Sequence, residues 1–455
     1  MQPTTVFSDR VLLPHGLRSA AVEVRGARIA AVHEVAAAPE GSLDLTGCLV
    51  MPALVNGHTH LPMASLRALG GLAARSGNVV EELWFGIESR LTAADVRAFT
   101  RMGALECLLA GTGAVFEHYY EGRAVAEALR DTGLTGVVAP TLQDLGGPGV
   151  PELEAQLEVT LEIHRDPGLA AAGISAMWGP HATDTVSDAL WRRLLSQGDD
   201  LPLHVHVAQS LEEVARVRAR GASPVELLDR VGALEREVLL VHGLYVSDAD
   251  RRLLDPKRHR LGHTPWSQTQ FAFPAPVDAW LDEGFDVVVG TDAGACNDSM
   301  NVQQELRLMA VGSLYEVTAA TTDFRASGNE ATAAALGEHR RQVFDATHRR
   351  SDPRWLLGTV GEAAGALVPS LGLGRLEVGA LANLAAYDLE HPALWPAADP
   401  LRAVVFGDAT QALHSLLVAG RWIGEVGDVR ALCRRDDVRA WREEATQRWK
   451  KLLDL

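Results

Sequence analysis

Lysine is nearly absent from this 455-residue chain, which contains only Lys257, Lys450 and Lys451. Asp and Glu total 59 residues against 42 for Lys and Arg, so the formal net charge is -17 at pH 7. The chain therefore lacks the basic surface that nucleic acid or an anionic membrane requires. We expect neither as a partner, and we expect a small neutral or cationic molecule as the substrate.

Cysteine and long apolar runs are scarce as well. The four cysteines form no Cys-x-x-Cys pair and lie far apart, at Cys48, Cys107, Cys296 and Cys433. They suggest neither a disulfide framework nor a thiolate zinc site. The N-terminal residues do not resemble a secretory segment, and no uncharged apolar stretch reaches the roughly 18 residues of a membrane span. We therefore expect a cytoplasmic protein.

Apolar runs that end in polar residues alternate with helix-like stretches through the middle of the chain. The predicted strand ends lie near His60, Tyr120, Thr141, His181, Gln209, Val246, Trp266 and Gly294. Eight strand–helix units predict an α/β fold, namely a (β/α)8 TIM-type barrel with its active site at the carboxyl ends of the strands.

Short strand-like segments occupy both ends of the chain. Residues 1–52 contain short apolar segments separated by polar residues, and the same pattern returns after the barrel-like region. We expect the two ends to form one small β-sandwich together. The predicted organisation is residues 1–52 in the sandwich, 53–365 in the barrel, and 366–455 in the sandwich with a terminal helix.

Histidines end several of the apolar runs. His58 and His60 close the first one, and strand alternation puts both imidazoles on one face. A metal needs about four ligands converging from separate elements, so further ligands are expected at other strand ends. The candidates there are His204, His206, His242, His263 and Asp292. A single buried histidine is usually a packed core residue, but this recurrence favours a metal site.

Two motifs carry a resemblance to a known family. They are Pro52-Ala-Leu-Val-Asn-Gly-His-Thr-His60 and Gly374-Arg-Leu-Glu-Val-Gly-Ala-Leu-Ala-Asn383. Together with the intervening histidines, they make the chain similar over nearly its whole length to the amidohydrolase superfamily. The resemblance is to the mononuclear branch of aminohydrolases and chlorohydrolases, which act on heterocycles such as adenosine derivatives, pterins, guanine and triazines. It also implies a homodimer.

The resemblance implies a ligand set for one divalent metal ion. That set is His58, His60, His206 and Asp292. Three imidazoles and one carboxylate suit Zn(II), with Fe(II) as the alternative, and they leave one position for a water whose pKa falls toward ~7. Binuclear relatives need a bridging carbamylated lysine, and none of the three lysines is placed for that role. We therefore expect a single metal ion.

Other residues receive implied or candidate roles. The resemblance assigns His242 to the hydrolytic water, Asp292 to accepting its proton, and His181 and His263 to the substrate. His118 and His181 are candidate proton donors because histidine titrates near neutrality. The tryptophans that could stack on a planar ring are Trp84, Trp178 and Trp266. His204 lies one layer deeper than His206, so we expect it to be packed and hydrogen-bonded.

One position departs from the deaminase pattern. Deaminases of this branch carry a glutamate three residues after the third histidine, whereas this chain reads His206-Val-Ala-Gln209. An amide can bind a substrate nitrogen but cannot supply a proton, and losing a general acid costs about 10² to 10⁴ in rate. Either a neighbouring acid replaces it, or the leaving group needs little protonation, or the protein only binds. The neighbouring acids are Glu117, Glu212 and Glu213.

The predicted function is that of a metal-dependent hydrolase of deaminase type. In the reaction that the resemblance implies, metal-bound hydroxide attacks a C–N bond of a small amino-heterocycle. Two alternatives stay open because of Gln209. One is hydrolysis of another leaving group, such as a halide, a thioether or an activated amide. The other is a catalytically impaired binding protein on the same scaffold.

Overall fold

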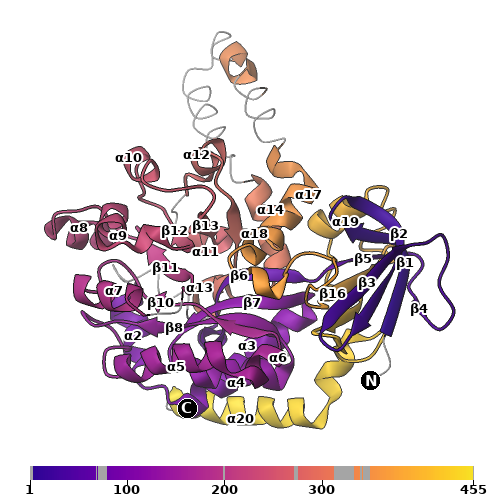
Figure 1. The fold of residues 1–455 in the computed structure, drawn as a ribbon, viewed down its shortest axis with the longest axis horizontal. Helices are drawn as coiled ribbons and strands as arrows, with labels where there is room; N and C mark the ends of the chain where they lie inside the picture. Colours follow the sequence, from indigo (N-terminus) through magenta and orange to yellow (C-terminus); the bar gives the residue numbers. More distant parts are fainter. Residues whose placement is uncertain are drawn as a thin grey trace.

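A computed structural model describes residues 4–67, 69, 79–197, 200–270, 275–311, 333–338, 341 and 349–453. Within these ranges, no helix combines the length and apolarity needed to cross a membrane. Figure 1 shows a larger body of strands surrounded by helices and a smaller set of strands at one side, which contains both indigo and yellow segments. Residues from both ends of the chain therefore share one sheet.

Two parallel sheets form the centre of the larger body. The first has the order β10-β8-β7-β6-β15, with β9 beside β8. Its strands are β6 (Leu54–His60), β7 (Thr112–Tyr119), β8 (Thr135–Leu142), β9 (Ile174–Ala176), β10 (Gly179–Pro180) and β15 (Asp292–Ala293). The second has the order β11-β12-β13-β14. Its strands are β11 (Leu203–Val207), β12 (Val238–His242), β13 (His259–His263) and β14 (Val287–Val289). Parallel bridges Trp178–Leu203 and Ala182–His206 join the sheets.

Helices cover the outside of these strands, which explains why every residue of β7, β8, β11, β12 and β13 is buried. The helices up to the middle of the chain are α2 (Phe85–Glu88), α3 (Ala93–Leu109), α4 (Gly122–Thr132), α5 (Leu153–Arg165), α6 (Pro167–Ala171), α7 (Asp188–Leu195), α8 (Leu211–Ala219) and α9 (Pro224–Val231). Those that follow are α10 (Asp248–Arg251), α11 (Pro265–Gln270), α12 (Val277–Asp282), α13 (Gly294–Asn297), α14 (Val302–Val311), α17 (Pro353–Thr359) and α18 (Glu362–Gly365). Short 3-10 or π turns are η1 (Leu61–Leu66), η2 (Val80–Trp84), η3 (Ala233–Glu235), η4 (Arg349–Ser351) and η5 (Pro369–Leu371).

Several helices begin at a side chain that caps their free backbone N–H groups. Thr92, Ser223 and Ser247 each form a capping box with an acidic residue three positions later. Ser187 and Ser210 cap α7 and α8. Because these caps follow the parallel strands or their loops, local sequence fixes where each helix starts.

The smaller sheet combines strands from both ends of the chain in the order β18-β17-β16-β5-β1-β2-β3, with β4 beside β1. Its early strands are β1 (Thr4–Leu13), β2 (Gly16–Arg25), β3 (Arg28–Glu34), β4 (Leu43–Asp44) and β5 (Cys48–Pro52). Its late strands are β16 (Leu384–Asp388), β17 (Leu413–Val418) and β18 (Arg421–Trp422). The early and late parts meet where β5 pairs antiparallel with β16.

The last segment of the chain returns to the larger body. After α19 (Pro400–Phe406) and η6 (Val429–Arg434), helix α20 (Asp436–Leu452) lies along the outside of this body next to α3 (Figure 1). Trp449 Nε1 donates a hydrogen bond to the Ser65 carbonyl at 2.7 Å, and Arg448 pairs with Asp95 at 3.0 Å. These contacts fix α20 next to the segment that follows β6.

One side chain connects the smaller sheet with the amino-terminal ends of two parallel strands, β7 and β8. Asn383 Nδ2 donates to the Gly113 carbonyl at 3.2 Å and to Thr135 Oγ1 at 2.9 Å, while its Oδ1 accepts from the Ala419 N–H at 2.8 Å. Asn383 is buried. One amide therefore links β7, β8 and the turn after β17.

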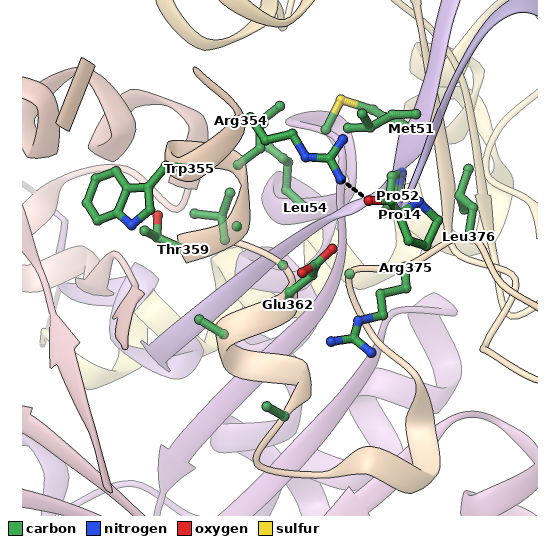
Figure 2. Close-up of a pocket in the computed structure, with 18 of the residues that line it drawn as sticks. Pro14, Met51, Pro52, Leu54, Arg354, Trp355, Thr359, Glu362, Arg375 and Leu376 are labelled. Atoms are coloured by element: carbon green, nitrogen blue, oxygen red, sulfur yellow. Dashed lines mark hydrogen bonds between the residues drawn. The ribbon is translucent and has the colours of Figure 1, made fainter. Parts of the chain in front are cut away.

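A cavity of about 370 Å³ lies at the same junction. Figure 2 shows Arg354 reaching across it toward Pro14, whose carbonyl oxygen accepts a hydrogen bond at 2.8 Å. Trp355, Glu362 and Arg375 also line it. The cavity adjoins Leu54 and Val287, which begin their strands, so it lies at the end of the parallel strands away from the predicted ligands.

The expected α/β fold with parallel strands is confirmed. Strands β11, β12 and β13 end a few residues before the predicted ends at Gln209, Val246 and Trp266. Ala208 and His242 adopt left-handed backbone conformations, with φ of 51° and 74°, which stop β11 and β12. Pro265 begins α11 and has no N–H to extend β13.

Candidate metal centre

Five predicted side chains come together at the carboxyl ends of the strands. His58 and His60 lie on β6, His206 on β11, His242 ends β12, and Asp292 begins β15. Ligand atoms of His58, His60 and His206 lie within 4.8 Å of one another, as do those of His58, His242 and Asp292. His58 and Asp292, which are 234 positions apart in the sequence, therefore face one point.

Asp292 reaches the histidines because its strand passes very close to β6. A Cβ atom on Gly290 would lie only 2.4 Å from His58 N and 2.6 Å from His58 O. Asp292 pairs with Thr59 in parallel register. Glycine at 290 is therefore required for this approach, and a larger residue would push the carboxylate away.

The side chain of Asn56 also holds the strand of Asp292 close to β6. Its Oδ1 accepts from the Thr291 N–H at 2.9 Å, and its Nδ2 donates to Thr291 Oγ1 at 2.8 Å. Asp292 follows in a left-handed conformation, with φ of 63°. Such backbone strain persists only where the surroundings hold it, as at functional sites.

The Nδ1 atoms of the three strand histidines are already used. His60 Nδ1 donates to the His118 carbonyl, and His206 Nδ1 donates to the His181 carbonyl at 2.7 Å. His58 Nδ1 lies 2.8 Å from His204 Nε2. Each ring therefore offers Nε2 to the common point, as is usual for metal-ligating histidines.

A metal ion fits this arrangement. His58 Nε2 is buried and has no hydrogen-bond partner among the described residues. Asp292 Oδ1 lies 3.7 Å from His58 Nε2 and 3.5 Å from His60 Nε2. A buried, unpartnered nitrogen demands an explanation, and a divalent cation between three imidazoles and a carboxylate supplies one.

Burial keeps the imidazoles neutral, as metal binding requires. Desolvation lowers the pKa of His58 to about 4, although nearby Asp292 acts in the opposite direction. It also lowers the pKa values of His60 and His206. Burial alone would raise the pKa of Asp292, but His58 and the other imidazoles hold that pKa below its usual range. The group therefore presents neutral nitrogens and an ionised carboxylate.

Ser267 is a further contact that the sequence reasoning missed. Its Oγ donates to Asp292 Oδ2 at 2.7 Å. Ser267 lies on α11, directly after β13, and is buried. Its position shortly after His263 could have suggested a location near the strand ends, although nothing in the sequence identifies its partner.

His242 lies beside His206, with ring centroids 5.4 Å apart and ring planes at 15°. Its backbone is left-handed, with φ of 74°. Thr264 Oγ1 lies 3.5 Å from its Nδ1. The strained turn at the end of β12 therefore carries this ring into the group.

His118 and His181 flank His206. The ring centroids lie 4.9 Å from His206 for His118 and 5.2 Å for His181. Thr141 Oγ1 lies 3.1 Å from His118 Nδ1, and Thr185 Oγ1 lies 3.0 Å from His181 Nδ1. Burial lowers the pKa of His181 to about 3. Both predicted histidines are thus within the cluster.

The aromatic residue nearest to His181 was also missed. Phe85 lies 5.8 Å from His181 between ring centroids. The predicted residue, Trp84, is half-buried and packs against the main hydrophobic core. Phe85 directly follows Trp84 in the sequence, and Trp84 stays a prediction as a substrate contact.

The remaining predicted residues are His263, Trp178 and Trp266. His263 ends β13 and is buried, and burial lowers its pKa to about 3. Trp178 is only 1% exposed and belongs to the core, whereas Trp266 is 43% exposed. Trp178 therefore offers no free face for stacking.

Gln209 follows β11, and Glu213 holds its backbone. Glu213 Oε2 accepts from the Gln209 N–H at 2.8 Å, and Oε1 accepts from the Ala208 N–H at 3.1 Å and from the Thr183 hydroxyl. Burial raises the pKa of Glu213 to about 7. This carboxyl group is thus engaged in fixing the turn.

Glu117 is engaged on the other face of β6. The Leu61 N–H donates to both of its oxygens, at 2.9 and 3.0 Å, and Thr59 Oγ1 bonds to it as well. Thr59 alternates with His58 and His60, so it faces away from them. Glu117 therefore supports the His-Thr-His segment from behind.

Comparison with known proteins identifies the family. Residues 49–336, more than half of the chain, match the model of the amidohydrolase family. The 5-methylthioadenosine/S-adenosylhomocysteine deaminase of Natronomonas pharaonis is 31% identical over 402 residues, which cover 87% of this chain and 86% of that one. The chain belongs to the amidohydrolase family. This amidohydrolase falls in the deaminase branch and is a hydrolase that acts on carbon–nitrogen bonds.

Solved structures of other amidohydrolases share the fold. A zinc-bound adenosine deaminase from Xanthomonas campestris superposes with a TM-score of 0.77 at 23% identity and covers 98% of both chains. The zinc complex of atrazine chlorohydrolase from Arthrobacter aurescens superposes with a TM-score of 0.74 at 20% identity, covering 96% of this chain and 99% of that one. This amidohydrolase therefore has the fold of both a deaminase and a chlorohydrolase.

Proposed function

We propose that this amidohydrolase removes an amino group by hydrolysis from a small heterocycle, with one metal ion at the strand ends. The observation that carries the proposal is the buried, unpartnered Nε2 of His58 beside Asp292. The activity named for the Natronomonas pharaonis relative supports an adenosine derivative as the substrate class to test first.

The proposed ligands are His58, His60, His206 and Asp292. Zn(II) is the proposed ion, with Fe(II) as the alternative, because both accept imidazole nitrogen and carboxylate oxygen. When bound, the metal would lower the pKa of a water toward ~7 and so supply a nucleophile at neutral pH. The neutral imidazoles and the ionised carboxylate are ready for this ion without a change of protonation.

The other residues of the cluster act on water and substrate. Asp292, whose Oδ2 is held by Ser267, accepts a proton from the attacking water, and His242 orients that water. The proposed substrate contacts are His118, His181, His263, Gln209 and Trp84. Phe85 joins them as an apolar surface beside His181.

A second candidate function follows from the occupied carboxyl groups. Gln209 cannot donate a proton as an acid does, and the carboxyl groups of Glu117 and Glu213 are both engaged by Thr hydroxyls and backbone N–H groups. Glu212, the third neighbouring acid, is exposed in the first turn of α8. This arrangement favours a leaving group that needs little protonation, such as a halide, a thioether or an activated amide. The fold shared with a chlorohydrolase is compatible with this candidate.

The architecture is also part of the proposal. We propose that the two parallel sheets close into one (β/α)8 barrel over residues 53–365, supported by the bridges at Ala182–His206 and the pairing of β15 with β6. Residues 1–52 and 366–455 would form the sandwich, with α20 as the terminal helix. A cytoplasmic homodimer stays a prediction from the sequence.

The test is product release by zinc-loaded protein from a panel of substrates. Ammonia is measured with amino-purine nucleosides, pterins and amino-triazines, and chloride with chloro-triazines. Ammonia release by the wild type supports the deaminase if His206→Ala loses both this activity and the bound zinc. Chloride release without ammonia release supports the second candidate. Unchanged activity in His206→Ala would contradict the ligand assignment.

A further inference from the structure

His204 differs from the other partners of the metal-site histidines. The Nδ1 atoms of His60 and His206 bond to backbone carbonyls, whereas the Nδ1 atom of His58 faces a side chain, His204 Nε2, at 2.8 Å. Both His58 and His204 are fully buried. The orientation of His58 therefore depends on a side chain, which a mutation can remove, and not on the backbone.

The ring of His204 is fixed by its surroundings. Its centroid lies 5.0 Å from that of His58 with planes at 69°, and 5.2 Å from that of His118 with planes at 77°. His204 lies on β11, two residues before His206, so both rings project from the same face of that strand. The strand that supplies one proposed ligand thus also supplies the support for another.

The positions of the ring protons on His58 and His204 show what the contact between the two side chains does. A neutral imidazole carries one ring proton, and a metal on His58 Nε2 leaves that proton at Nδ1. His58 then donates to His204 Nε2, which must accept, so the proton of His204 lies on its own Nδ1. That Nδ1 is buried without a partner among the described residues, a cost that a packing residue would not need to carry.

We propose that His204 is a positioning residue that fixes the orientation and the proton position of His58 for metal binding. This proposal rests on the proposed metal site. Packing alone would be served equally well by an apolar side chain of similar size, whereas positioning requires an acceptor atom at the place of Nε2. The two roles therefore differ in which substitutions they tolerate.

The test is the zinc affinity of purified protein, measured by competition with a chromophoric chelator. The variants are His204→Leu, His204→Asn and His204→Gln. The side-chain oxygen of Gln reaches the place of Nε2, whereas that of Asn is too short. We expect zinc affinity to fall about 10- to 100-fold in the Leu and Asn variants and to stay within about threefold in the Gln variant.

His259 provides a matched control. It is a buried histidine at the start of β13, bonded through Nε2 to the Leu234 carbonyl at 3.0 Å, and it has no contact with the metal-site histidines. His259→Leu should destabilise the fold while zinc affinity stays within about threefold. Thermal unfolding of the metal-free proteins separates loss of fold from loss of affinity.

The outcomes distinguish this proposal from the proposed function. Zinc affinities of the Leu and Asn variants equal to that of the wild type would overturn the role of His204 alone. If His204→Leu does not fold, the Asn and Gln pair decides, and equal affinities in these two would overturn it. A wild-type protein that binds no zinc would overturn the metal site and this proposal together.

Discussion

Gln209 combines a fixed backbone with a side chain that has no hydrogen bond to the residues that the structure describes. Glu213 holds the Gln209 N–H at 2.8 Å, and Ser210 caps α8 immediately afterwards. The backbone at 209 therefore does not depend on which side chain is present. The chemistry of this position can be changed without moving the turn.

Gln209→Glu tests whether the missing acid limits deamination. For the deaminase, we expect ammonia release to rise by about 10² or more, because a carboxyl group can protonate the departing amine. Steady-state rates with the best amino-heterocycle of the panel measure the change. Gln209→Ala is the control, since it removes the amide without adding an acid. A fall in rate for both variants would instead mean that the amide itself contacts the substrate.

The junction of β6 and β7 shows how one element supports another. The Thr59 hydroxyl has a single proton but two possible acceptors, the Phe116 carbonyl at 3.3 Å and Glu117 Oε2. When that proton goes to Phe116, a protonated Glu117 can donate to Thr59. Burial raises the pKa of Glu117 to about 8, although its bonds to Thr59 and Leu61 act in the opposite direction. The carboxyl group is therefore neutral near pH 7.

The raised pKa makes stability depend on pH. Between its ordinary value of 4.5 and about 8, the folded state keeps a proton on Glu117 that the unfolded state has lost. The stability that this proton provides is complete below pH 4.5 and is lost as pH rises through about 8. Glu117→Gln imitates the protonated group and does not titrate. From about pH 5 to about pH 9, the wild type should lose more than about 1 kcal/mol relative to Glu117→Gln.

Urea unfolding of the two metal-free proteins at several pH values provides this measurement. A constant difference between them across the range would show that Glu117 titrates normally. Metal-free protein is used because metal binding has its own pH dependence. The same data show whether the support behind β6 matters for folding or only for the histidines.

At the scale of the whole molecule, Asn383 connects the two regions. Its amide satisfies groups on β7, β8 and the turn after β17, and its own carbonyl accepts from the Ala53 N–H at 2.9 Å. These bonds lie at the amino-terminal ends of β6, β7 and β8, and the histidines lie at the other end of the parallel strands. A substitution at Asn383 should therefore change the stability of the fold without changing metal binding.

Asn383→Ala should lower the free energy of unfolding by about 3 kcal/mol, because it leaves buried groups on both regions without partners. Urea unfolding measures the loss, and chelator competition should give an unchanged zinc affinity. A variant as stable as the wild type would mean that water or local shifts replace the amide. A lower zinc affinity would mean that the two ends of the parallel strands are coupled.

The sequence predicted the features that repeat with strand periodicity. Alternation and order along the chain placed His58, His60, His206 and Asp292 among the candidates near strand ends, and the family resemblance selected them as the predicted ligand set. The shared sheet of the two ends was visible for the same reason. Local patterns are sufficient when every strand repeats one geometry.

Contacts between distant segments could not be predicted in this way. Ser267 meets Asp292, Phe85 meets His181, and Gly290 allows the approach to His58 only because of the packing in three dimensions. The early ends of β11 and β12 depend on left-handed residues that alternation does not reveal. The sequence therefore located the proposed ligands but not the groups that orient them.

The pairing of β5 with β16 has a consequence for protein synthesis. The ribosome completes β5 about 330 residues before β16, which at about 5–20 residues per second is a wait of roughly 15–70 s. During that time β5, four of whose five residues are buried in the finished fold, presents an open strand edge of the kind that promotes aggregation. Slower translation of the intervening codons should therefore reduce the yield of folded enzyme without changing a single amino acid.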